Sequence, residues 1–182
     1  MIYRAAEKTM ETERLLLRPF TEADAPEVSV LCNNYAIYKS TLNVPYPYTI
    51  DCALSWIATH QQNFEENRLY EWAITDKLSG QLYGAIGLSN QQPHQRGEIA
   101  YWIGEHYWGN GYGTEATQAI IAFAFQEKKY HRVYAQYFQS NPASGKIMEK
   151  CGMHYEGTLK QHVYKNGAFE DIVYYGLINP NH

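Results

Sequence analysis

The segment from residue 107 to 114 carries the clearest chemical signal in this sequence, because it reads Tyr-Trp-Gly-Asn-Gly-Tyr-Gly-Thr. Its alternate glycines, Gly109, Gly111 and Gly113, leave successive backbone N–H groups uncovered, and a helix starting at Thr114 adds further donors and positive potential. A loop of this kind before a helix binds anions, most readily a phosphate or diphosphate. Positions 104 to 118 contain no lysine or arginine. We therefore expect backbone N–H groups and hydroxyls, not side-chain cations, to hold the phosphate.

Two other phosphate-binding motifs do not fit this loop. A P-loop requires Gly-Lys-Ser/Thr, whereas Gly113 is followed directly by Thr114. A dinucleotide fingerprint reads GxGxxG and has an acidic residue at a strand end about 20 residues later. This loop reads GxGxG, and residues 127 to 129, at that distance, belong to a predicted helix.

The elements around the loop form a strand–helix–strand unit. Glu98–Ile103 has the pattern of a strand, and Thr114–Lys129 carries an apolar face at helical spacing. Arg132–Phe138 is a second predicted strand, after which a helix begins at its N-cap Asn141 and ends at Gly152. Such a unit requires a parallel strand pair.

The rest of the chain supplies mostly hairpins and shorter helices. Strands are predicted at Leu15–Phe20, Tyr70–Thr75, Gln81–Ser89, Met153–His162 and Phe169–Ile178, and helices at Asp24 to the low 30s and at Asp51–Glu66. The turn pair Asn166-Gly167 joins the last two strands, and two prolines exclude regular structure from Asn43–Tyr48. The pattern predicts an α+β fold with a mixed sheet and helices on both faces.

Length and composition favour one domain of an ordinary globular protein. The 182 residues are 45% hydrophobic and carry a net charge of −4, which argues against nucleic acid or anionic lipid as a partner. The longest apolar run, Ala119–Phe125, is too short to cross a membrane. Three scattered cysteines and seven histidines without metal-ligand spacing predict reduced thiols, a cytoplasmic location and no bound metal.

Several motifs, in order along the chain, make the sequence resemble the GNAT N-acetyltransferases, in particular the ribosomal-protein N-terminal acetyltransferase branch. The motifs are Glu13–Arg18, Gly97–Ile103, Tyr107–Ala116, Asn141–Ser144, Glu149–Met153 and Glu156-Gly157. The resemblance covers nearly the whole chain from residue 11. It implies a single acetyltransferase domain over 1–182, with 1–10 as an N-terminal extension. It also implies a mostly antiparallel twisted sheet in which two central parallel strands splay apart.

The resemblance further implies that acetyl-CoA is the co-substrate. Its diphosphate would be cradled by the loop residues Trp108, Gly109, Asn110, Gly111, Tyr112, Gly113 and Thr114. The backbone around Ile103 would pair with the pantetheine arm, which Asn141 would contact while also capping its helix. The broad family has Gln or Arg at the first loop position, so Trp108 is expected to act there only through its backbone.

Two residues are the catalytic candidates. In many family members a tyrosine that acts as general acid stands seven residues after the asparagine that matches Asn141. That position here is Met148. In this branch a serine three residues after that asparagine usually donates a hydrogen bond to the leaving sulfur, and Ser144 stands at this position. The alternative is that Ser144 only packs beside the cofactor. Glu98 stands on the central strand where the family often holds a base, with a solvent-facing carboxylate as the alternative.

The expected reaction is direct transfer of the acetyl group to a neutral primary amine, with a backbone N–H stabilising the oxyanion. An α-amine has a pKa of about 8, so on the order of a tenth is neutral at pH 7, far more than for lysine. A protein or peptide N-terminus is therefore the favoured acceptor. We expect the acceptor pocket at Tyr35–Tyr48, the following helix and the Glu170 side of the last hairpin. Its aromatic residues are Tyr35, Tyr38, Tyr46 and Tyr48, and its acidic residues are Asp51, Glu65 and Glu66.

Other functions remain open at this point. The same chemistry would serve a small amine such as a polyamine, an amino acid or an antibiotic. Because position 148 is not a tyrosine, a second function class is a non-catalytic acyl-CoA sensor on the same fold. A third function class is an NAD-dependent oxidoreductase. Either a monomer or a homodimer is compatible with the sequence.

Overall fold

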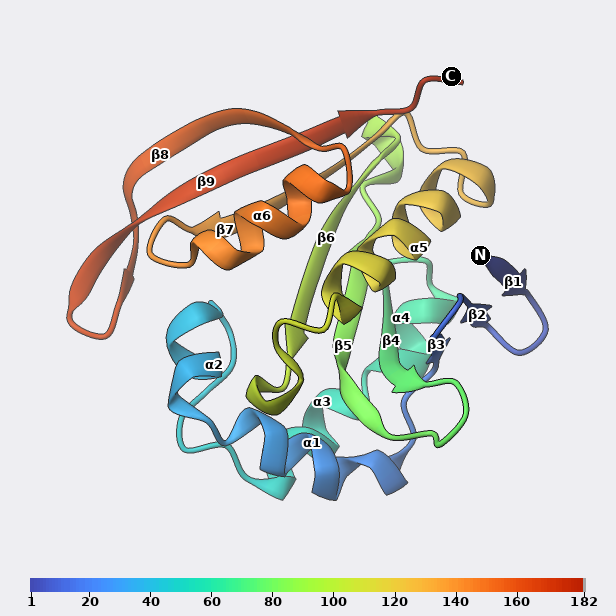
Figure 1. The fold of residues 1–182 in the computed structure, drawn as a ribbon, viewed down its shortest axis with the longest axis horizontal. Helices are drawn as coiled ribbons and strands as arrows, with labels where there is room; N and C mark the ends of the chain where they lie inside the picture. The colour runs from blue at the N-terminus through green and yellow to red at the C-terminus, as the bar shows by residue number, and fades with distance from the viewer. Residues whose placement is uncertain (182) are drawn as a thin grey trace.

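The computed structural model describes residues 1–181, built around one nine-stranded sheet (Figure 1). The strands are β1 (Ile2–Arg4), β2 (Thr9–Glu11), β3 (Leu15–Arg18), β4 (Leu69–Asp76), β5 (Leu82–Ser89), β6 (Arg96–Ile103), β7 (Arg132–Phe138), β8 (His154–Lys165) and β9 (Ala168–Ile178). Their order in the sheet is β1-β2-β3-β4-β5-β6-β7-β9-β8. Neighbours pair antiparallel except β6 and β7, which are parallel. The expected mixed, mostly antiparallel sheet is confirmed.

Six α-helices and three short 3₁₀ turns occupy the described part of the chain. The α-helices are α1 (Ala25–Cys32), α2 (Tyr35–Ser40), α3 (Ile50–Ile57), α4 (His60–Glu65), α5 (Tyr112–Gln126) and α6 (Pro142–Lys150). The turns are η1 (Glu22–Asp24), η2 (Gln92–His94) and η3 (Glu105–Tyr107). In Figure 1, α5 and α6 lie on the near face of the central strands, with α1, α2 and α3 grouped at the lower end.

Alternating side chains of the strands build a separate core on each face of the sheet. On one face Tyr70 and Trp72 of β4 are fully buried against α5, where Phe123 meets Trp72 edge to face at 5.2 Å between ring centroids. On the other face Ala73 and Leu82 pack with α1 and α3. Helices therefore cover both faces, as the apolar alternation requires.

Several elements differ from the sequence-based expectation. The predicted helix over 51–66 is two helices, α3 and α4, and α2 was not predicted. The Asn34 side chain caps α2 by accepting N–H hydrogen bonds from Ala36 (2.8 Å) and Ile37 (3.2 Å), so an Asn cap was the available signal. Strands β1 and β2 were also not predicted, because each has only three residues, too few to show alternating polar and apolar side chains. The hairpin at Asn166-Gly167 is confirmed, with positive φ at both residues (54° and 78°).

An ion pair ties the end of β3 to the start of α1. Asp24 is 8% exposed, and both of its carboxylate oxygens accept hydrogen bonds from the Arg18 guanidinium, at 2.7 and 2.8 Å. The Thr21 N–H donates to the same carboxylate at 2.8 Å. Burial raises the pKa of Asp24, but the Arg18 and Thr21 hydrogen bonds outweigh it, and the net pKa lies below the ordinary value.

We expect Asp24→Asn to lower the free energy of unfolding by about 2 kcal/mol at pH 7, because the Arg18 charge loses its partner. A depressed folded-state pKa gives stability that is present above the unfolded-state pKa and is lost as pH falls through the folded-state value. The cost of Asp24→Asn should therefore shrink as pH falls below about 4. Urea unfolding at several pH values measures this. Glu22→Gln, at an exposed position nearby, is the matched control. If both variants lose the same free energy of unfolding, the stabilising role of the Arg18–Asp24 ion pair is contradicted.

Candidate functional site

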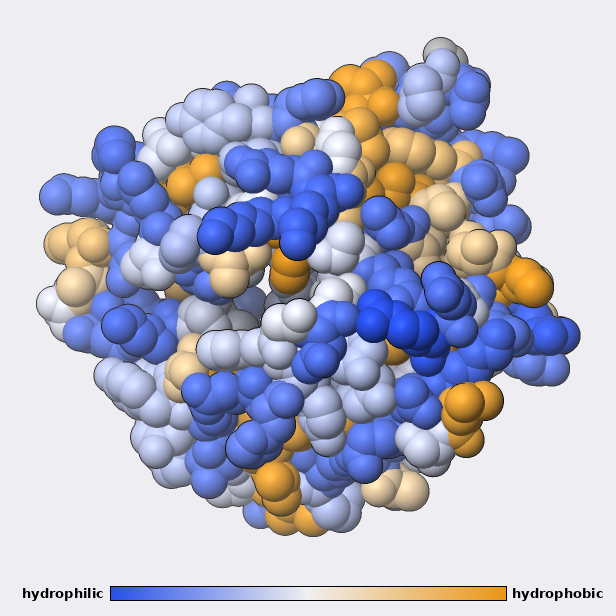
Figure 2. Space-filling view, viewed as in Figure 1, coloured by the Kyte–Doolittle hydropathy of each residue, from blue (hydrophilic) through white to orange (hydrophobic). Residues whose placement is uncertain are grey.

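Two central strands separate partway along their length. Strands β6 and β7 pair only at three positions, Arg96–Glu98 against Arg132–Tyr134. Beyond Glu98, β6 pairs only with β5 on its other side. A cavity of about 800 Å³ lies at this opening, lined by residues of both strands, of α3 and α6, and of the segment after α2. Figure 2 shows the surface hollowed between the regions that Figure 1 labels α2 and α6.

The glycine-rich loop lies at the end of β6 and leads into α5. Gly109 and Gly111 have φ values of 78° and 83°, which only glycine adopts without strain, and a Cβ on Gly109 would meet open space. Asn110 folds back, its side-chain amide donating to the carbonyls of Tyr107 and Trp108 at 3.1 and 3.2 Å. The first N–H groups of α5, from Tyr112 onward, have no acceptor within the helix. The loop is thus preorganised, with its free donors facing outward.

Two loop residues are held by contacts with the neighbouring elements, although Trp108 remains 47% exposed. The Trp108 N–H donates to the Glu105 carbonyl at 3.1 Å, and its indole Nε1 donates to the Ile103 carbonyl at 2.6 Å. Trp108 therefore anchors the loop to the end of β6 through its side chain. Gly113 packs tightly, since a Cβ there would lie 3.0 Å from Ile147 of α6. These contacts leave Gly109, Asn110 and Gly111, which are exposed, and Tyr112 and Thr114, which are half-buried, as the loop's remaining ligand candidates.

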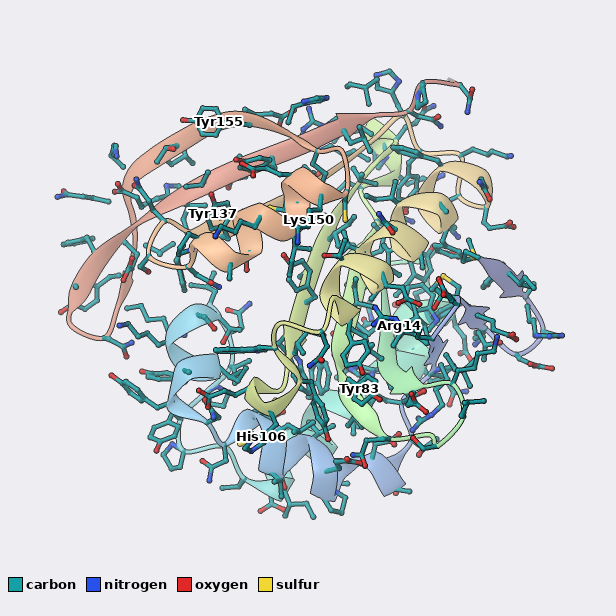
Figure 3. All side chains as sticks on the ribbon, in the orientation of Figure 1. Arg14, Tyr83, His106, Tyr137, Lys150 and Tyr155 are labelled. Atoms are coloured by element: carbon teal, nitrogen blue, oxygen red, sulfur yellow. The ribbon has the colours of Figure 1, made fainter. Side chains whose placement is uncertain are left out.

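A side-chain cation also stands at this loop, contrary to the expectation from the local sequence. Arg14 donates from Nη1 to the Asn110 carbonyl at 3.0 Å and from Nε to Glu115 at 2.7 Å. Its guanidinium lies 4.9 Å from the Tyr112 ring centroid. Nε and Nη1 make these hydrogen bonds, and Nη2 makes none within residues 1–181. Arg14 and Lys150 line the same groove beside Gly111, and Figure 3 shows them on either side of the start of α5. Because both are remote in sequence from the loop, no local pattern could have revealed them.

Glu98 occupies the last paired position before the strands separate. Its carboxylate lines the cavity and accepts hydrogen bonds from Gln136 Nε2 at 2.6 Å and Tyr134 Oη at 3.3 Å. Both donors are neutral, and no Lys, Arg or His is among the residues that line the cavity. The carboxylate is therefore held in place without a balancing cation, an arrangement suited to accepting a proton or holding an ammonium group.

Ser144 lies on α6 and lines the same cavity. Asn141 donates from its side-chain amide to Ser144 Oγ at 3.1 Å, which leaves the serine proton free to point elsewhere. The expected side-chain cap by Asn141 is wrong: it stands at the N-cap position, but its side chain makes no capping hydrogen bond. The amide is turned so that Nδ2 donates to Ser144 Oγ, and Oδ1, the atom that would cap the helix, accepts from none of its first N–H groups.

A second hydroxyl near Ser144 was missed by sequence reasoning. Tyr101 of β6 lines the cavity, and its hydroxyl donates to the Ser144 carbonyl at 3.2 Å. Burial raises the pKa of Tyr101, so the phenol stays protonated at neutral pH. Met148 is buried and lines the same cavity, which leaves the hydroxyls of Ser144, Tyr101 and Tyr137 as nearby groups with a proton to donate. A tyrosine in a strand carries no pattern that distinguishes this position from a core position.

The far side of the cavity is walled by the segments expected for an acceptor. Residues 40–45, Tyr48 and Asp51 line it on one side, and Val163 and Ile172 of the last hairpin on the other. Three tyrosine rings gather outside, with centroids 5.6 to 5.8 Å apart; they belong to Tyr35, Tyr38 and Tyr46. Tyr48 is instead part of the core.

The acidic residues of this wall differ from the expectation. Glu65 and Glu66 are exposed and hydrogen-bond Gln61 and Gln62. They do not line the cavity, whereas Glu71 of β4 does. Glu71 accepts a hydrogen bond from the Trp56 indole at 3.1 Å. Glu170 faces outward to Ser140 at 3.0 Å.

No cluster of three or more potential metal ligands occurs among the described residues, and no helix among them is long and apolar enough to span a membrane.

Comparison with known proteins gives consistent matches. The family model described as "Acetyltransferase (GNAT) domain" matches residues 14–154. A Bacillus subtilis (strain 168) protein named uncharacterized N-acetyltransferase YoaA is 32% identical over 174 residues, which cover 94% of this chain and 97% of the relative. The ribosomal-protein-serine acetyltransferase of Escherichia coli (strain K12) is 27% identical over 155 residues, covering 84% of this chain and 86% of the relative.

A solved structure shares the fold. RimL, described as a ribosomal L7/L12 alpha-N-protein acetyltransferase in complex with coenzyme A, has a TM-score of 0.86, with 19% identity and coverage of 93% of this chain and 97% of that chain.

We expect Arg14→Gln to weaken the binding of coenzyme A about tenfold, because the loop loses one organising hydrogen bond and the groove loses a positive charge. Isothermal titration calorimetry with coenzyme A at low and high salt measures the effect, and the difference between variant and wild type should narrow at high salt. Arg4→Gln, which removes an exposed arginine paired with Glu11, is the control. Unchanged affinity in Arg14→Gln would show that the guanidinium serves only the fold.

Proposed function

The chain belongs to the GNAT acetyltransferase family, and from this we propose that it acetylates the N-terminal α-amine of a protein or peptide. Family membership establishes the coarser statement: the protein is an enzyme, an N-acetyltransferase that takes its acetyl group from acetyl-CoA. One observation supports a cationic amine as the acceptor, and the choice of an α-amine among such amines rests on its lower pKa. The cavity at the β6–β7 opening is lined by Asp51, Glu71 and Glu98 and by no basic side chain, which suits an acceptor that arrives as an ammonium ion.

Each substrate has its own approach to the opening. The diphosphate of acetyl-CoA would lie on the N–H groups of Gly109 to Thr114 beside Arg14, and its pantetheine arm would run between β6 and β7. The free inner edge of β6 past Glu98 supplies backbone groups for that arm, although the Ile103 carbonyl is already used by the Trp108 indole. The acceptor would enter from the side of Tyr48 and Asp51.

Transfer then requires two proton movements that the cavity residues can support. Glu98, fixed by Gln136 and Tyr134, accepts the proton that the ammonium group gives up before attack. The neutral amine attacks the thioester carbonyl and the C–S bond breaks. The Ser144 hydroxyl, held by Asn141, gives its proton to the departing sulfur and takes up the proton that the nitrogen loses on becoming an amide. An α-amine suits this site better than lysine, because its lower pKa demands less of the base.

Relatives' names support the acceptor class without defining it. The Escherichia coli relative is named a ribosomal-protein-serine acetyltransferase, and RimL is described as an alpha-N-protein acetyltransferase. Both descriptions name proteins as acceptors, and that of RimL also names the α-amine. A small-amine acceptor would use the same carboxylates, so the two hypotheses differ in what must surround the reacting amine.

An acceptor screen with acetyl-CoA tests the proposal. The panel holds a peptide with a free α-amine, the same peptide with a blocked α-amine and one free lysine, a polyamine and a free amino acid. We expect coenzyme A release and a mass increase of one acetyl group chiefly with the first peptide. Turnover chiefly with the polyamine or amino acid would replace the peptide hypothesis. Tight coenzyme A binding with no turnover on any acceptor would favour a sensor.

Substitutions at the two catalytic candidates have separate signatures. We expect Ser144→Ala to lower kcat about 10- to 100-fold with little change in KM for acetyl-CoA, because the hydroxyl acts as sulfur leaves. Glu98→Gln should also lower kcat about 10- to 100-fold, because the cavity loses the carboxylate that accepts the proton of the ammonium group. Ser140→Ala, whose hydroxyl contacts Glu170 outside the cavity, is the control. If Ser144→Ala is fully active and Tyr101→Phe is slow, the proton donor is the phenol instead.

A further inference from the structure

The tip of the last hairpin reaches across the molecule to α2, and Lys165 makes the contact. Its ammonium Nζ donates hydrogen bonds to the backbone carbonyls of Thr41 and Leu42, the latter at 3.2 Å. The same Nζ lies 4.5 Å from the ring centroid of Tyr38 and 6.0 Å from that of Phe138. Figure 1 shows the β8–β9 hairpin extending toward the end of α2. One side chain thus joins segments about 120 residues apart in the sequence.

These partners belong to opposite walls of the acceptor side of the cavity. Thr41 and Leu42 line it from the segment after α2, while Phe138 of β7 and Val163 of β8 line it from the sheet. The Lys165 ammonium therefore bridges the two walls where the cavity opens. Among the described residues it has no carboxylate within ion-pair distance, so carbonyl dipoles and aromatic faces hold the charge.

Apart from Lys165, this wall is held by the ring contacts among Tyr35, Tyr38 and Tyr46 and, at its far end, by Tyr48, whose N–H donates to Asn33 Oδ1 at 3.1 Å. α2 has only six residues, and the chain after it, from Thr41 to Tyr48, contains two prolines and no regular secondary structure. Leu42 and Tyr46 are about half exposed, at 50% and 48%. The segment from Thr41 to Pro47 makes few backbone hydrogen bonds, so the loss of the Lys165 contacts would leave it less constrained. Burial lowers the pKa of Lys165, which marks the partial desolvation of its ammonium at this junction.

We propose that Lys165 is a specificity-determining residue that sets the width of the acceptor entrance, so that the enzyme selects acceptors by the bulk behind the reacting amine. This proposal rests on the function proposed above, because it takes this side of the cavity as the acceptor's path. With the ammonium bound to both walls, a slender chain passes and a bulky one is excluded. Loss of the ammonium frees the Thr41 and Leu42 carbonyls and lets the wall move outward.

The test compares Lys165→Met, which keeps the length of the side chain and removes the donor, with Lys165→Arg, which keeps the charge. Lys160→Met is the matched control, since Lys160 lies on the same strand, is 70% exposed and pairs with Asp171 away from α2. The first readout is hydrogen–deuterium exchange of residues 35–48 without any acceptor. We expect about tenfold faster exchange in Lys165→Met, near wild-type exchange in Lys165→Arg, and no change in α5.

The second readout is acceptor selection. Two peptides share one N-terminal residue, followed by glycines in one and by tryptophans in the other. We expect the ratio of kcat/KM for the bulky peptide to that for the slender one to rise about tenfold in Lys165→Met, with KM for acetyl-CoA unchanged. Faster exchange with an unchanged ratio would overturn the selectivity role, and unchanged exchange would overturn the bridging role itself.

Failure of the proposed function is recognisable separately. If the wild type acetylates neither peptide, the N-terminal acceptor assignment fails, whatever the exchange data show. The same ratio is then measured with a slender and a bulky derivative of the amine that the screen identifies. An unchanged ratio there overturns the proposal for Lys165, and a raised ratio supports it for the new acceptor.

Discussion

The structure depends on one interrupted ladder of hydrogen bonds. Strands β6 and β7 pair over three residues and then part, although each remains paired to its outer neighbour, β5 or β9. Unpaired strand edges normally invite aggregation or are covered, because their backbone donors and acceptors need partners. Here the two inner edges face a cavity, so an extended ligand between them can take the place of the missing strand. The pantetheine arm of acetyl-CoA is such a ligand.

Contacts at each end of the opening keep this arrangement in place. At the closed end Gly97 allows tight packing, since a Cβ there would lie 2.5 Å from the Ser89 carbonyl. At the open end Tyr137 presses against α6, where a Cβ on Gly145 would meet its hydroxyl at 2.5 Å. Side chains thus maintain the separation on the α6 face, and substitutions at these glycines would disturb the site through the backbone. Overpacking at such positions costs typically about 1–3 kcal/mol.

The sequence was informative wherever the signal was local. Alternation located the central strands, helical spacing located α5, and the alternate glycines with the following helix start located the loop. The motif order identified the family, and the family match confirms it. The site residues that the sequence did not reveal are brought into place by contacts between distant segments. Arg14 reaches a loop 96 residues away, and Lys165 meets α2 across more than 120 residues.

Local patterns also misjudged how some side chains are used. Asn141 stands at an N-cap position, but its amide is turned so that Nδ2 donates to Ser144 and Oδ1 caps no N–H of the helix. Trp108 anchors its loop through the indole, which no spacing rule would predict. The weak net charge of −4 likewise hides an uneven distribution of charge. Asp51, Glu71 and Glu98 line the cavity at the β6–β7 opening without a basic side chain, whereas the groove beside Gly111 holds Arg14 and Lys150 together with Glu13 and Glu115. The cavity therefore favours a cationic ligand, while at the groove Arg14 is already paired with Glu115, so the backbone N–H groups of the loop must supply much of the attraction for an anion.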